Sequence, residues 1–112
     1  MNKIFILIIF FSYNVYANNN FKEFEEKFDQ YYYNQDFEKV KILKDKYIKL
    51  AKKEYGSNSG EFALALHKVA LYYHEFDYYD EAIELRYQIL KIFERLNFQN
   101  MIAREHNNLC SM

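Results

Sequence analysis

Two histidines are the side chains of this sequence best placed to bind a metal. His67 and His74 are seven residues apart, which puts them on one face of a helix, and Glu75 and Asp77 follow. Imidazole and carboxylate ligands together suit zinc. Seven helical residues span about 10 Å, so one ion would reach both imidazoles only with help from another helix. The spacing therefore favours two histidines on a helix face over a metal site.

The single cysteine, Cys110, follows His106 by four residues, on the same helical face. A thiol beside an imidazole is able to act as a nucleophile. A free cysteine also packs as a small hydrophobe, and we expect Cys110 to be buried between helices. The alternative for an odd cysteine in an exported chain is a disulfide between two molecules. We expect no catalytic residue and no cofactor.

Residues 1–17 have the pattern of a secretory signal peptide. Lys3 supplies a positive charge, residues 4–11 are all apolar, and Val15-Tyr16-Ala17 precedes a polar leader. An apolar run of this length is too short to span a membrane, which needs roughly 20 residues. We therefore expect export of residues 18–112 to the periplasm or the medium, with no stable membrane span after cleavage.

The composition favours one compact helical domain. The chain has 112 residues, no proline and two glycines, so long helices with few interruptions are expected. Its formal net charge is −1, which does not resemble the basic footprint of a nucleic-acid-binding protein. The charges are unevenly spread, since residues 23–29 are acidic and residues 39–53 are rich in lysine. We expect the two segments to form solvated helix faces that attract each other. The alternative for the lysines is an anionic partner, such as a membrane surface.

Apolar residues recur at helical spacing, and no segment alternates with period two. Asp36 and Ser59 are expected to cap the helices that follow them. The pattern predicts helices over about Phe21–Tyr31, Phe37–Tyr55, Leu66–Tyr73, Tyr79–Leu96 and Met101–Met112.

The predicted helices repeat in pairs with a constant period. A step of 42 joins Tyr31 to Tyr73, Phe37 to Tyr79, Val40 to Ala82 and Leu43 to Leu85. Such a period predicts stacked hairpins, because one hairpin cannot bury its apolar face alone. We expect an all-α fold of about five helices in residues 18–112, in units of about 21–55 and 61–96 and a partial unit of 99–112.

The second unit carries Ala63, Leu66, Val69, Ala70 and Tyr73, then Tyr79-Asp80-Glu81-Ala82 and Leu85, with Gly56 ahead of them. In these positions it resembles the tetratricopeptide repeat, in the 42-residue variety found in kinesin light chains. Ala70 and Ala82 are small where two helices must approach, and Tyr73 and Tyr79 are expected to fill the space beside them. The first unit is degenerate, the usual glycine between the helices is Asp77, and the chain stops within the third unit.

The resemblance implies a concave groove lined by the first helix of each hairpin. It therefore implies an exported module that binds a protein or peptide, without catalytic activity. The alternatives are a self-associating structural subunit and a small metal-binding protein. The residues expected in the groove are Glu25, Asp29 and Tyr32 in the first unit, His67, Leu71 and His74 in the second, and Arg104, Asn107 and Ser111 in the third.

The last predicted helix has apolar residues and no helix after it. Met101, Ile102, Leu109 and Met112 would form an apolar strip at the end of the array. An uncovered strip of this kind favours association. We expect a weak homodimer through this helix, linked by Cys110 if that thiol is exposed.

Overall fold

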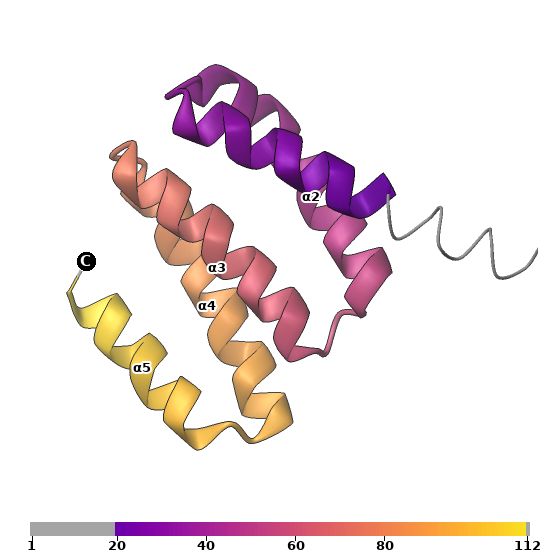
Figure 1. Cartoon of the computed structure of the whole chain (residues 1–112). Helices are drawn as coiled ribbons and strands as arrows, with labels where there is room; N and C mark the ends of the chain where they lie inside the picture. The colour runs from indigo at the N-terminus through magenta and orange to yellow at the C-terminus, as the bar shows by residue number, and fades with distance from the viewer. Residues whose placement is uncertain (1–19, 112) are drawn as a thin grey trace, which may run out of the picture.

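The computed structural model describes residues 20–111, and every regular element in that range is a helix (Figure 1). Helical residues run from 20 to 33, a segment called here helix 20–33. It is followed by α2 (Phe37–Tyr55), α3 (Gly60–Glu75), α4 (Tyr79–Leu96) and α5 (Gln99–Cys110). The predicted all-α fold is confirmed. The predicted signal peptide, residues 1–17, lies outside the described residues.

Successive helices turn back on each other and stack side by side. Figure 1 shows α3 and α4 between the hairpin made by helix 20–33 and α2 and the final helix α5. α3 packs against α2 and α4, and α4 packs against α5. Within residues 20–111 no helix is both long and apolar enough to cross a membrane.

Two of the helices begin at the predicted caps. The Asp36 carboxylate accepts a hydrogen bond from the Lys39 amide at 3.3 Å, and the Ser59 hydroxyl accepts one from the Phe62 amide at 3.1 Å. Each bond satisfies an amide that has no partner within the helix. Both predicted caps are confirmed. α5 starts two residues earlier than predicted, at Gln99, because the preceding turn is complete at Phe98.

Three helices end in the same kind of turn. Gln35, Asp77 and Asn97 have φ angles of 58°, 67° and 58°. After each, the amide of the next residue donates to the carbonyl oxygen five residues earlier, at 2.9, 2.9 and 3.0 Å. This is the Schellman geometry, in which glycine usually occupies the left-handed position. Gln35 and Asp77 are separated by the same step as the repeated apolar residues, so the sequence period is also a period of the backbone.

Replacing Gln35 with glycine should therefore stabilise the folded protein. It is exposed and holds a side chain in a conformation that costs about 1 kcal/mol relative to glycine. We expect Gln35→Gly to raise the free energy of unfolding by about 0.5–1 kcal/mol, measured by chemical denaturation. Asn34→Gly is the control, since Asn34 is exposed but has no positive φ, and it should destabilise slightly. A loss of stability in Gln35→Gly would contradict the strain argument.

The core lies where α3 meets its neighbours. Ala70 and Ala82 are fully buried, as expected of small residues between α3 and α4. Phe28 is also fully buried and stacks on Tyr47, with ring centroids 4.6 Å apart. The other side chains that are at most 1 % exposed are Val40, Ala51, Ala63, Leu66, Val69 and Ile89.

The prediction that Tyr79 packs in the core is wrong by one residue, because Tyr78 packs there. Tyr79 is 45 % exposed, and its hydroxyl donates to Asp77 at 2.8 Å. Tyr78 packs inward in its place, 4.5 Å from the Phe37 ring and 6.2 Å from the Tyr73 ring. The reason is the turn, because the residue after the left-handed position is directed back onto the helix that has just ended.

Cys110 is exposed, so the prediction of a buried thiol is wrong. Burial required a helix packed over this face of α5, and within the described residues none covers it. On α5 the only buried side chain is that of Glu105. Exposure of Cys110 is the condition that a disulfide between two molecules requires.

Candidate functional site

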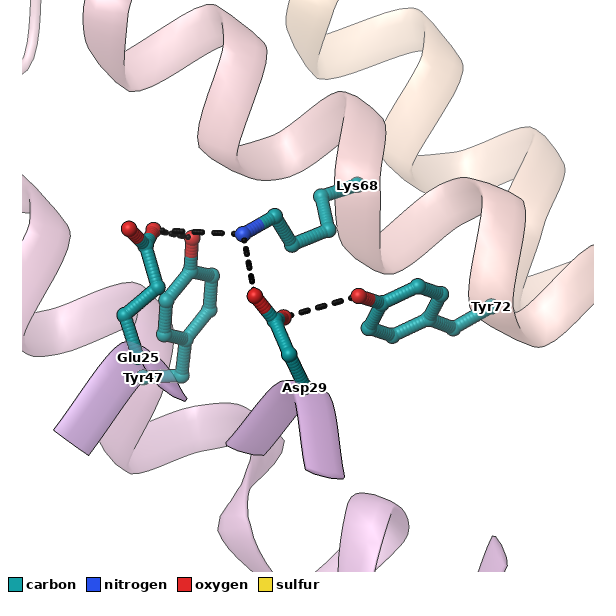
Figure 2. Close-up of polar contacts among 5 residues, drawn as sticks. All are labelled: Glu25, Asp29, Tyr47, Lys68 and Tyr72. Atoms are coloured by element: carbon teal, nitrogen blue, oxygen red, sulfur yellow. Dashed lines mark hydrogen bonds and ion pairs between the residues drawn. The ribbon is translucent and has the colours of Figure 1, made fainter. Parts of the chain in front are cut away.

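A polar cluster joins helix 20–33 to α2 and α3 (Figure 2). The Lys68 ammonium lies 3.1 Å from the Asp29 carboxylate and 3.3 Å from that of Glu25. Each carboxylate also accepts a hydrogen bond from a phenol, Glu25 from Tyr47 at 2.6 Å and Asp29 from Tyr72 at 2.7 Å. The cluster thus connects three helices through five side chains.

The environment of this cluster keeps both phenols protonated. Burial, followed by the bond to Glu25, raises the pKa of Tyr47 above its usual range. Burial, followed by the bond to Asp29, does the same for the pKa of Tyr72. Two carboxylates therefore share one ammonium, and the cluster carries a net negative charge. The side chains of Lys68, Glu25 and Asp29 are 26–29 % exposed, so this charge reaches the surface.

Tyr32 extends the cluster towards the ends of helix 20–33 and α3. Its ring stacks on Tyr72, with centroids 3.8 Å apart and planes 9° apart. Its hydroxyl donates to Glu75, and that bond, with burial, raises the pKa of Tyr32 to about 12. Beside it lies a pocket of about 430 Å³ lined by Tyr32, Tyr33, Gln35, Glu75 and Phe76.

His67 is half-buried at a junction of α3, α4 and α5. Its Nδ1 accepts a hydrogen bond from the Arg86 guanidinium, which also lies 3.5 Å from the Glu105 carboxylate. Arg86 and Glu105 are 5 % and 3 % exposed. Burial, and then the charges of Arg86 and Arg104, lower the pKa of His67 to about 4. At neutral pH His67 is therefore an uncharged acceptor for Arg86.

The remaining predicted groove residues lie on the surface. Leu71 is 41 % exposed, and His74 is exposed, with its ring 5.1 Å from that of Tyr79. Arg104 and Asn107 are exposed on α5, as is Ser111 after it. The structure thus brings together Glu25, Asp29 and Tyr32 with α3, and links His67 to α4 and α5 instead. Among residues 20–111, no three His, Cys, Asp or Glu side chains are placed to hold a metal ion.

The partners of these residues were not predicted from the sequence. Glu25 and Asp29 are four residues apart on one helical face. Two neighbouring carboxylates repel each other, and a nearby cation relieves that repulsion. Lys68 is the only lysine or arginine of α3, which is a signal that could have identified it. No comparable local signal pointed to Arg86 and Glu105, because they come from different helices.

The predicted attraction between the acidic and basic helices does not take the form of ion pairs. In residues 20–111 no ion pair joins helix 20–33 to α2. Lysines of α2 lie over aromatic rings instead, Lys44 at 5.3 Å from the Tyr73 centroid and Lys46 at 5.1 Å from that of Phe24. Such contacts contribute about 0.5–1 kcal/mol at exposed sites.

Comparison of this chain with protein families, curated proteins and solved structures found no match.

Proposed function

We propose that the chain is an exported, non-catalytic module of the tetratricopeptide type that binds a protein or peptide segment along α3. The repeat of turns at Gln35 and Asp77, together with the 42-residue sequence period, supports the family. The pattern of residues 1–17 supports export.

The observation that carries the proposal is the exposed face of α3. Leu64 and Leu71 are 61 % and 41 % exposed, although α3 has neighbours on both sides. They are seven residues apart, which is just under two helical turns, so they lie almost in line along the helix, between His67 on one side and Lys68 on the other. Lys68 is bonded to helix 20–33, and His67 to Arg86 beside α5. The leucines therefore form an apolar strip flanked by polar groups.

Such a strip suits an extended or helical peptide. Single exposed leucines need no explanation, but two on one face with polar flanks form a patch that a partner is able to cover. The flanking groups supply hydrogen-bond and charge complementarity, and the buried leucine contacts supply affinity.

Substitution of Leu71 should separate binding from folding. The binding partner for this test is a peptide selected from a displayed random library. We expect Leu71→Glu to lower the affinity for this peptide about tenfold or more, because the carboxylate would be buried in an apolar contact. Affinity would be measured by isothermal titration calorimetry, with helicity followed by circular dichroism.

Ile42→Glu is the matched control, since Ile42 is 70 % exposed on α2, away from the strip. It should bind the peptide like the unmodified protein. Equal binding by Leu71→Glu, or a loss of helicity in that variant alone, would contradict the proposal.

A further inference from the structure

The aromatic pocket lies where two helices end. Tyr32, Tyr33 and Gln35 come from the last turn of helix 20–33 and the residues after it, and Glu75 and Phe76 from the end of α3. The rings of Tyr32 and Tyr33 are 5.3 Å apart at 63°, and those of Tyr32 and Phe76 are 6.1 Å apart at 87°. Because neighbouring rings stand at steep angles, they form walls facing different directions. The volume of about 430 Å³ is within the range of small-molecule sites.

The electrostatics of this pocket favour a cation. Among residues 20–111, Glu75 is the only charged residue that lines the pocket, and no basic side chain lines it. The Tyr32 hydroxyl is bonded to Oε2 of Glu75, which orients the carboxylate. Helix C-termini carry about half a negative charge, and two of them meet here. Aromatic ring faces attract cations as well.

The position of the pocket indicates which molecule would supply the cation. Glu75 follows Leu71 by four residues and therefore lies one turn further along the same face of α3. A peptide covering Leu64 and Leu71 would reach the pocket with its next side chains. Arginine is well suited to it, since a guanidinium stacks on aromatic rings and donates two hydrogen bonds to a carboxylate.

We infer that the pocket formed by Tyr32, Tyr33, Gln35, Glu75 and Phe76 binds an arginine side chain of the peptide that lies along α3. This inference rests on the proposed function, which it deepens by naming one feature of the partner: a basic residue next to an apolar stretch.

The test is an NMR titration of the purified protein with N-acetyl-arginine amide. Saturable shifts should appear at the amides of Tyr33, Gln35 and Phe76. N-acetyl-citrulline amide has nearly the same shape without the charge and should bind about fivefold more weakly or worse. Tetramethylammonium tests the other source of a cation, a small free ammonium compound, and should bind more weakly than the arginine derivative.

Two variants connect this binding to the pocket. Glu75→Gln removes the charge, and Tyr33→Ala removes a ring that is 76 % exposed, so the second has little influence on folding. Each should lower the affinity for N-acetyl-arginine amide about fivefold. Glu84→Gln and Tyr87→Ala change the same residue types on an exposed part of α4 and should leave the affinity unchanged.

The inference is overturned if no saturable shift occurs, if citrulline binds equally well, if tetramethylammonium binds more tightly, or if neither pocket variant weakens binding. Its failure is distinguishable from failure of the proposed function. If arginine does not bind but Leu71→Glu still abolishes peptide binding, only the pocket inference is lost. If arginine binds but Leu71→Glu binds peptide normally, the strip along α3 is not the peptide site, and the assignment of the pocket to that peptide is lost with it.

Discussion

Replacing Arg86 with methionine should lower the free energy of unfolding by about 3–5 kcal/mol. Arg86 and Glu105 are both almost fully buried, and the guanidinium is the only positive partner of that carboxylate among the described residues. Without Arg86, Glu105 would remain as an uncompensated charge in a low-dielectric site. Domains of this size are stable by about 5–15 kcal/mol, so the loss is a large part of the total. Chemical denaturation followed by circular dichroism measures it.

The double variant Arg86→Met with Glu105→Leu gives the decisive comparison. Removing both charges should restore most of the lost stability, because buried pairs replaced by apolar groups are often neutral. The pair is also imperfect, since Arg86 Nε and Glu105 Oε2 are buried without a hydrogen-bond partner. Arg95→Met is the matched control, an exposed arginine of the same helix bonded to Asn58, and should cost less than about 1 kcal/mol. A double variant as unstable as the single one would contradict this account.

The parts of the fold that could be predicted are those decided by local sequence. Caps at Asp36 and Ser59 depend on the bond between a side chain and an amide three residues later. The 42-residue period was visible because apolar residues repeat it, and one such pair, Val40 and Ala82, is fully buried in both units. The inward side chain of Tyr78 was not predicted, since it follows from the positive φ of Asp77, a residue that is not glycine.

For the candidate site, the sequence predicts which helix face each residue occupies but not which side chains it contacts. Glu25 and Asp29 were expected on one face of their helix, and that face meets α3. Their bond to Lys68 joins residues about forty positions apart, so it depends on how the helices stack. His67 was expected beside Leu71, yet its depth is determined by Arg86 and Glu105, which α4 and α5 bring to it. The exposure of Cys110 likewise depends on which element packs against α5 and not on the residues next to Cys110 in the sequence.

The junction around His67 should also make the protein lose stability as the pH falls from about 6.5 towards 4. An unfolded histidine titrates near pH 6.5, whereas burial and the charge of Arg86 lower the pKa of His67 to about 4 in the folded state. Between these values the unfolded chain binds a proton that the folded chain does not. The stabilisation is therefore complete above about pH 6.5 and is lost as the pH falls towards 4.

We expect the free energy of unfolding to fall by about 2 kcal/mol more between pH 7 and pH 4.5 in the unmodified protein than in His67→Gln. This energy difference is smaller than the full pKa difference implies, because the His67 side chain is partly exposed to solvent. Glutamine does not titrate, and its amide oxygen is able to accept the bond from Arg86. Denaturation curves at several pH values, with carboxylate titration common to both proteins, isolate the contribution of His67. His74→Gln, at an exposed position of the same helix, should follow the unmodified protein. Parallel pH profiles for His67→Gln and the unmodified protein would show that the imidazole is not held neutral by Arg86.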